Sequence, residues 1–277
     1  MPAASCRRCC SPEAGSRDES ARPCLRRPAS GDRGLSSPHA APNLLGNGEA
    51  ALVQAGNVNY RSETDLPETV GLFPLVGALL LPGGQMPLNI FEPRYLQMID
   101  DAIRSGRVIG MIQPRLDGGR KDNGDTELCQ VGCIGRITSL TETGDGRYIV
   151  NLHGIARFRV IEELAARAPY RSCRIAAFVA DLDLGNGAAE VDRDGLLKAF
   201  RLYLDANQLE ADWESVTKAS NETLVNALCM MSPYGAAEKQ ALLEAPDLKT
   251  RAETLIAITE MAVVREGSED GGPRTLQ

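Results

Sequence analysis

The sequence predicts an α+β fold in which a small barrel or strongly curled sheet with one helix is followed by a helical bundle. Between residues 70 and 180, short apolar runs separated by turn residues are typical of β-strands. One amphipathic stretch among them has the spacing of a helix. After about residue 190, the period of the apolar residues changes from about 2 to about 3.6, which indicates helices.

The chain has 277 residues and is 43% hydrophobic, enough for a buried core. We expect a disordered tail at 1–57, a β-rich domain at 58–185, a helical bundle at 190–266 and a second disordered tail at 267–277. The first tail is rich in Arg, Pro and Ser and has no apolar period. Because regular patterning begins near Val58, an over-extended gene start is an alternative explanation of this tail.

The expected strands are the apolar runs 70–75, 88–91, 108–113, 128–140, 147–152, 157–162 and 170–180. The segment "TGDG" at 143–146 supplies the positive φ angles of a tight hairpin. In the run 157–162, strict alternation predicts that Phe158 and Val160 point inward and that Arg157 and Arg159 point outward.

A helix is expected at 93–105. Pro93 suits a first helical turn, and Gly106 suits a left-handed stop. The apolar stripe of this helix comprises Leu96, Ile99 and Ile103.

Three further stripes predict the helical bundle. Pro233 and Pro246 mark helix boundaries, and Asp247 is a good N-cap. The stripes are Leu196, Phe200 and Tyr203; Leu224, Leu228 and Met231; and Leu248, Leu255, Ile258 and Ala262.

The cysteines indicate neither a metal site nor disulfides. Cys6, Cys9, Cys10 and Cys24 lie in the unpatterned tail without a second ligand pair. Cys129 and Cys133 are four residues apart in a strand, about 13 Å, too far to share a bond or an ion. With Cys173 and Cys229, we expect them to be reduced core residues of a cytoplasmic protein.

Charge and motifs exclude several functions. Residues 1–50 hold seven Arg, no Lys and five acidic residues, so they carry +2 and the remainder carries −9. An acidic body makes nucleic acid an unfavourable partner, and no apolar run is long enough to span a membrane. None of the five lysines follows a glycine, which excludes the usual phosphate loop of ATPases. No catalytic motif and no cofactor site is evident, which favours binding over catalysis.

Three stretches resemble the N-terminal substrate-recognition domain of the Lon ATP-dependent proteases, in its free-standing bacterial form. They are "LFPLVGALLLPGGQMPLNIFEPRYLQMI" (72–99), "QVGCIGRITSLTETGDGRYIVNLHGIARFRV" (130–160) and "EKQALLEAPDLKTRAETLI" (238–256). The resemblance covers roughly residues 60–265. It implies a PUA-like, six-stranded pseudobarrel with one helix, followed by a C-terminal α-helical bundle.

The same resemblance implies a non-catalytic polypeptide-binding domain without ATPase or peptidase modules, acting as an adaptor or weak chaperone. Its implied partners are unfolded or degron-bearing polypeptides and a Lon-type or other ATP-dependent protease. The candidate peptide-binding residues are Leu81, Met86, Leu88, Phe91 and Tyr95. For Leu88 and Phe91, lining the core is an equal expectation.

Two alternatives remain from the residues alone. A small ligand or a substrate in the barrel cleft would use His153, Arg157 and Arg159 as polar groups. RNA binding, by analogy with PUA-type domains, is disfavoured by the acidic body.

Overall fold

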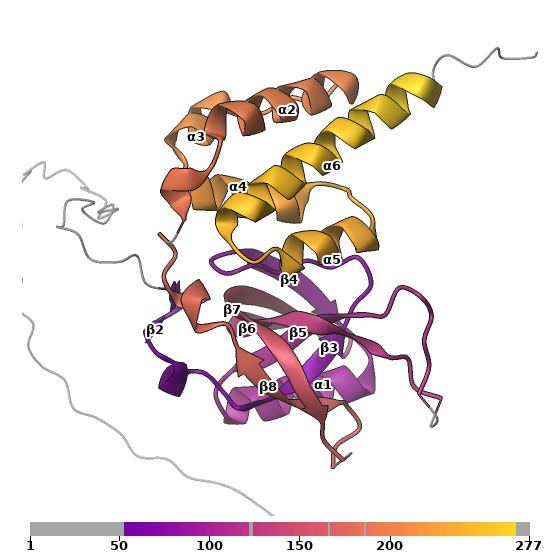
Figure 1. Cartoon of the computed structure of the whole chain (residues 1–277). Helices are drawn as coiled ribbons and strands as arrows, with labels where there is room; N and C mark the ends of the chain where they lie inside the picture. Colours follow the sequence, from indigo (N-terminus) through magenta and orange to yellow (C-terminus); the bar gives the residue numbers. More distant parts are fainter. Residues whose placement is uncertain (1–52, 122–123, 166, 186, 270–277) are drawn as a thin grey trace, which may run out of the picture. The chain divides into compact units, whose positions relative to one another are not determined.

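The computed structural model describes residues 53–121, 124–165, 167–185 and 187–269. These residues belong to one compact unit, in which a β-barrel is followed in sequence by a set of helices (Figure 1). The predictions made for residues 1–52 and 270–277, including the four tail cysteines, lie outside the described residues.

Five strands close a barrel and a sixth extends it. The sheet order is β4-β7-β6-β5-β3-β8, and β8 also pairs with β7, so β4 alone lies outside the closed ring. All pairs are antiparallel except β3 with β5. The strands are β3 Thr69–Pro74, β4 Gln85–Ile90, β5 Val108–Pro114, β6 Leu128–Glu142, β7 Tyr148–Glu163 and β8 Ser172–Ala177. The α+β pseudobarrel predicted from the sequence is confirmed.

The longest strands, β6 and β7, form the predicted hairpin. Gly144 and Gly146 have φ angles of 77° and 86°, the left-handed conformation that this turn requires. The two runs predicted as separate strands at 147–152 and 157–162 are one strand, so His153 lies within β7 rather than at a strand end. Register shifts along β6 and β7 let the long hairpin curl into the barrel.

A helix forms at each predicted stripe, although some members of the stripes are not buried. Helix α1 spans Pro93–Arg104, as expected from Pro93 at its start. Asp192, Asp212 and Ser220 cap α2, α3 and α4, and Asp247 accepts the Thr250 N–H at 2.7 Å at the start of α6. The other helices are α2 Arg193–Ala206, α3 Trp213–Lys218, α4 Asn221–Met231, α5 Ala236–Glu244 and α6 Leu248–Glu269, with short 3-10 turns η1 Glu63–Asp65, η2 Val179–Leu182 and η3 Ala188–Glu190.

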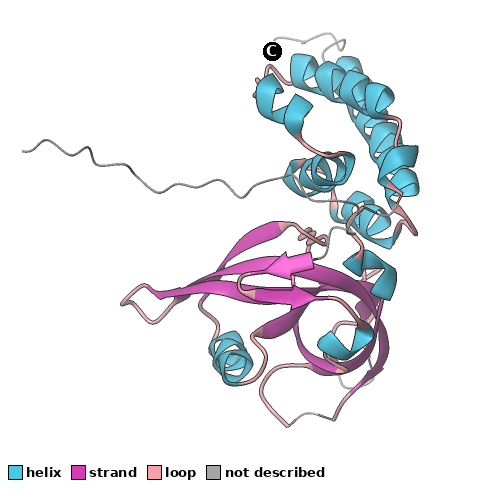
Figure 2. Cartoon of the chain, turned by 90° about the vertical axis from the view of Figure 1, so that its left-hand side faces the viewer, coloured by secondary structure: helices cyan, strands magenta, loops and turns pink. Residues whose placement is uncertain are grey.

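The barrel and the helices share one hydrophobic core. Helices α2 to α6 gather on one side of the barrel, and α1 lies at the opposite side (Figures 1 and 2). A single buried cluster nevertheless includes Ile99 of α1, Leu152 of β7, Leu228 of α4 and Leu255 of α6. The predicted change of period therefore separates two kinds of secondary structure that pack against each other.

At both ends of the described part, secondary structure extends beyond the boundaries expected from the sequence. Strand β1, Val53–Ala55, pairs with β2, Val58–Tyr60, and the Val53 side chain is fully buried, so the folded part begins before residue 58. Burial of this ribbon against the barrel explains its order. At the other end no proline interrupts α6, which runs to Glu269 rather than ending at residue 266.

The described cysteines are free thiols, as expected. Cys133, Cys173 and Cys229 are buried, and Cys129 is half-buried. Burial raises the pKa of the Cys229 thiol to about 12 and that of Cys173 to about 11, so both remain protonated near neutral pH.

Among the described residues, no helix combines the length and the apolar character that a bilayer crossing requires.

Candidate functional site, a cleft between the barrel and helix α4

A buried arginine joins the barrel to the helices. Arg157 of β7 is 5% exposed and donates to both carboxylate oxygens of Asp181 in η2 at 2.8 Å. Its guanidinium also donates to the backbone carbonyls of Leu243, Ala245 and Pro246, where α5 ends. These carbonyls lack helical partners and carry partial negative charge, so a cation there is favourable.

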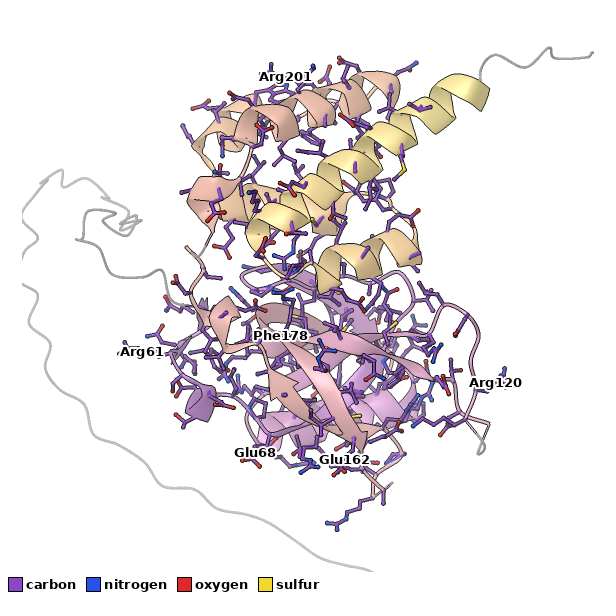
Figure 3. The ribbon with its side chains drawn as sticks, viewed as in Figure 1. Arg61, Glu68, Arg120, Glu162, Phe178 and Arg201 are labelled. Atoms are coloured by element: carbon purple, nitrogen blue, oxygen red, sulfur yellow. The ribbon has the colours of Figure 1, made fainter. Side chains whose placement is uncertain are left out.

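Arg157 points outward from the barrel, as predicted, but it is buried and does not meet solvent. Alternation places it on the outer face of the barrel, but η2 and the α5–α6 turn cover that face. The Phe178 ring lies at the same junction, with its centroid 5.2 Å from the Arg157 guanidinium carbon (Figure 3). The outer face of a barrel strand therefore serves here as an interior surface.

A second chain of hydrogen bonds holds the loop after Leu81 against α4. The Asn226 amide donates to the Pro82 carbonyl at 3.1 Å. Arg251 of α6 donates to the Asn226 side-chain oxygen at 3.2 Å and to the Leu242 carbonyl at 3.1 Å. Since all three side-chain bonds are buried, the loop, α4, α5 and α6 have fixed relative positions.

Beside this network lies a cleft of about 470 Å³ between the barrel loop and α4. One wall is the loop 82–85 with His153 of β7, and the other is α4. Leu184 and Gln54 also line it. The residues that α4 contributes are Glu222, Thr223, Asn226, Ala227, Met230 and Met231.

Glycines bring the barrel backbone close to α4. Gly83 has a φ of 74°, and its N–H donates to the Gly154 carbonyl at 2.9 Å. A Cβ at Gly84 would lie 2.3 Å from the Met230 sulfur, and one at Gly154 would lie 2.1 Å from the Leu81 carbonyl oxygen. The "PGG" segment at 82–84 is therefore a turn, and it also forms a wall of the cleft.

Two titratable side chains line this cleft. Burial raises the pKa of the Glu222 carboxyl to about 7, with Asp181 and Asp183 adding to the rise and Arg251 opposing it. Burial lowers the pKa of His153, so its imidazole is neutral near pH 7. Because both groups are half-buried and line the same cavity, they are the titratable contacts that an occupant meets there.

Three of the five predicted peptide-binding residues are inaccessible. Leu81 is fully buried, and Leu88 and Tyr95 are 8% and 7% exposed, all within the shared core. The Tyr95 ring packs on Phe73 with centroids 4.5 Å apart. The expectation of an exposed apolar surface is therefore wrong for Leu81, and Leu88 takes the core position that was its alternative expectation.

The other two predicted residues reach the surface at different depths. Met86 is half-buried, and the Phe91 side chain is 60% exposed with the Arg147 guanidinium 6.0 Å from its ring centroid. The expectation that Phe91 lines the core is therefore wrong, since it follows the end of β4. Binding of a peptide at Met86 or Phe91 stays a prediction.

The alternative polar set does not form one site. His153 lines the cleft, Arg157 is buried against Asp181, and Arg159 is exposed beside Phe178. A small ligand in the barrel cleft would therefore meet only His153 of the three.

Sequence reasoning missed the α4 wall. It assigned Met231 to a core stripe, but this side chain is 82% exposed, because α4 ends there and the following segment turns away. The available signal was Pro233, which places Met231 at the end of its helix, where a side chain has fewer neighbours to pack against.

Comparison of the fold with solved structures indicates the class of protein. The Lon N-terminal domain protein from Xanthomonas campestris has a solved structure that covers 68% of this chain and 97% of its own, with 24% identity and a TM-score of 0.51. The N-terminal domain of the Mycobacterium avium complex Lon protease covers 69% of this chain, with 19% identity and a TM-score of 0.50. The barrel with its following helices is thus the fold of a Lon N-terminal domain.

Sequence comparison gives the family. The model of the ATP-dependent protease La (LON) substrate-binding domain matches residues 69–260, and the chain belongs to this family. Lon protease 2 of Myxococcus xanthus is 29% identical over 75% of this chain, and the Lon protease of Parabacteroides distasonis is 30% identical over 69%. The chain spans about a quarter of the length of these relatives.

Proposed function

We propose that this chain is a non-catalytic polypeptide-binding module whose cleft between the loop 82–85 and α4 receives apolar segments of unfolded or degron-bearing proteins. The observation that carries the proposal is the methionine pair on the α4 wall. Met231 is 82% exposed and Met230 is half-buried, and both line the cleft. Methionine is unbranched and polarizable, so a surface of this kind adapts to varied apolar side chains.

The shape of the barrel favours side-chain recognition over strand addition. Strand β4 is the sheet edge in the described residues, with β7 as its single neighbour. Pro87 lies within β4 and has no N–H to donate, which weakens this edge as a template for a further strand. An unfolded segment is therefore better accommodated by the cleft, where apolar walls meet a few polar groups.

A binding module of this kind serves as an adaptor or a weak chaperone in protein quality control. In the adaptor role, it passes its clients to a Lon-type or other ATP-dependent protease. In the chaperone role, it shields apolar segments until they fold. The free thiols of Cys133, Cys173 and Cys229 fit a reducing compartment such as the cytoplasm.

A small-ligand protein is the second candidate function. The cleft volume of about 470 Å³ lies within the usual range of small-molecule sites, and Glu222 and His153 offer polar contacts. RNA binding has weaker support, because residues 51–277 carry a net charge of −9. Metabolites that raise the melting temperature while unfolded clients fail to bind would favour the ligand function.

The test uses a permanently unfolded client, fluorescein-labelled reduced and carboxymethylated α-lactalbumin, and fluorescence anisotropy. Met231→Glu places a charge on the exposed wall, and we expect the affinity to fall about tenfold, the cost of one misplaced polar group at an apolar contact. Met261→Glu is the matched control, because Met261 is 51% exposed on α6 and does not line the cleft. Equal affinity for both variants would overturn the proposed site, and no client binding at all would overturn the function.

A further inference from the structure

One carboxylate in the cleft lacks the partner that comparable carboxylates have. Glu222 is half-buried in the first turn of α4, and no hydrogen bond or ion pair reaches its carboxylate from the described residues. By contrast, Asp181 is paired with Arg157, and the half-buried Glu163 accepts from Arg171 at 2.6 and 2.8 Å. A partly desolvated carboxylate with an open side is suited to receive a cation.

The charged groups around Glu222 compensate its charge only in part: Arg251 favours the ionised carboxylate, but no ion pair joins the two side chains among the described residues. Arg251 of α6 is engaged by Asn226 and the Leu242 carbonyl, and Arg193 of α2 donates to the Asn221 side-chain oxygen at 2.7 Å. Asp181 and Asp183 add negative charge from the segment after β8. His153 on the facing strand is neutral near pH 7. The cleft therefore combines apolar walls with a net negative centre.

Resting on the proposed binding of polypeptides, we propose that this cleft selects segments in which a lysine or arginine side chain lies among apolar residues, with Glu222 receiving the cation. The long methylene stem of such a side chain packs along Met230, Met231 and Leu184 while its charged end reaches the carboxylate. The same walls hold the neighbouring apolar residues of the segment. Glu222 thus determines specificity, and the methionines supply adaptable contact.

The arrangement makes this selection depend on pH. The Glu222 carboxyl has a pKa of about 7 in the free protein, chiefly because of burial. A bound cation stabilises the ionised form, so binding draws off the proton that Glu222 holds below this pH. The affinity for a cationic segment therefore rises as the pH increases through about 7, and it levels off above.

The experiment compares two fluorescein-labelled heptapeptides of leucine and alanine that differ at the central residue, lysine or glutamine. The full chain is titrated with each by fluorescence anisotropy at pH 6 and pH 8. At pH 8 we expect the lysine peptide to bind about tenfold more tightly, the usual size of a charge-assisted hydrogen bond. The preference should shrink at pH 6 and disappear in Glu222→Gln, while Glu222→Asp should keep part of it.

Glu214→Gln is the matched control. Glu214 occupies the same position in the first turn of α3, but its side chain is 77% exposed and pairs with Lys218. Glu214→Gln changes the net charge by the same amount as Glu222→Gln, and it should keep the full preference for the lysine peptide over the glutamine peptide. Equal binding of both peptides, together with client binding that Met231→Glu weakens, would overturn the selectivity alone. Absence of both peptide binding and client binding would overturn both proposals. A self-associated state in sedimentation that Glu222→Gln abolishes would also overturn them, because a second copy of the chain would then occupy the cleft.

Discussion

Arg157 of β7 and Asp181 of η2 form a two-pronged ion pair, with two nitrogen–oxygen distances of 2.8 Å, at the junction of the barrel and the helices. The same guanidinium caps the C-terminus of α5 by donating hydrogen bonds to its last backbone carbonyls. Because the barrel supplies one wall of the cleft and α4 the other, this junction determines whether the cleft has a defined width.

Removing the arginine should loosen the whole unit. Arg157→Met leaves Asp181 buried without its cation and three carbonyls without a donor, so we expect the free energy of unfolding to fall by about 3–5 kcal/mol. Urea denaturation measures this. In the control, Arg174→Met breaks the exposed pair with Glu162 at 3.2 Å and should cost less than about 1 kcal/mol. Similar losses for the two variants would mean that Arg157 does not join the barrel and the helices.

The two glycines at the cleft should respond differently to alanine. At Gly154 the added Cβ meets the Leu81 backbone oxygen, which cannot move aside, so we expect a loss of about 1–3 kcal/mol. At Gly84 the closest atom is the flexible end of Met230, with the Leu81 backbone oxygen further away at 3.0 Å, so the loss should be smaller but client binding should weaken. Gly185→Ala is the control, since its nearest contact is 3.6 Å away. Calorimetry of thermal unfolding compares the stabilities of the three alanine variants. If Gly154→Ala lost the least stability, the close contact between Gly154 and the Leu81 backbone would be contradicted.

Glu222 should destabilise the fold above neutral pH. Its pKa is about 7 in the folded chain and near 4.5 when unfolded, so the folded state binds more protons between these values and stability falls as the pH rises through them. Glu222→Gln removes this penalty. We expect a gain on the order of 1 kcal/mol at pH 8 and almost none at pH 4, allowing for partial exposure. Urea unfolding of Glu222→Gln and Glu214→Gln at both pH values checks this. If Glu222→Gln gained the same stability at pH 4 and pH 8, the raised pKa of Glu222 would not be the cause.

Alanine substitutions in the segment 80–95 should lower the free energy of unfolding much more at a buried residue than at an exposed one. Leu81→Ala should cost about 2–5 kcal/mol, because Leu81 is fully buried in the shared core. Phe91→Ala should cost less than about 1 kcal/mol, because its side chain is 60% exposed. Chemical denaturation of both variants tests the assignment, and a large loss at Phe91 would indicate that its ring packs inside.

Local signals in the sequence were enough to predict most elements. Pro93 and the apolar stripe after it predicted α1, and the glycines at 144 and 146 predicted the β6–β7 hairpin, because both depend on backbone preferences within a few residues. The burial of Arg157 was beyond such signals. Alternation along a strand assumes that the outer face meets water, and only the tertiary fold shows that α5 ends against it.

The candidate site was hidden for a related reason. The candidate peptide-binding residues all lie in the segment 80–95, but the apolar residues of this segment mostly fill the core. Its glycine turn matters because it contacts α4. Glu222 lies about 140 residues further along the chain, in a helix whose own sequence gives no sign of what its first turn faces. Residue contacts of this sequence separation are determined by packing and not by local pattern.

The central claim, that clients bind at the α4 wall of the cleft, is tested most directly by NMR of methionine methyl groups. The full chain carrying ¹³C-methyl methionine is titrated with unlabelled carboxymethylated α-lactalbumin. We predict that the signals of Met230 and Met231 shift or broaden while those of buried Met98 and Met111 and exposed Met261 stay unchanged. Changes at Met86 or Met261 without changes at Met230 and Met231 would contradict the account.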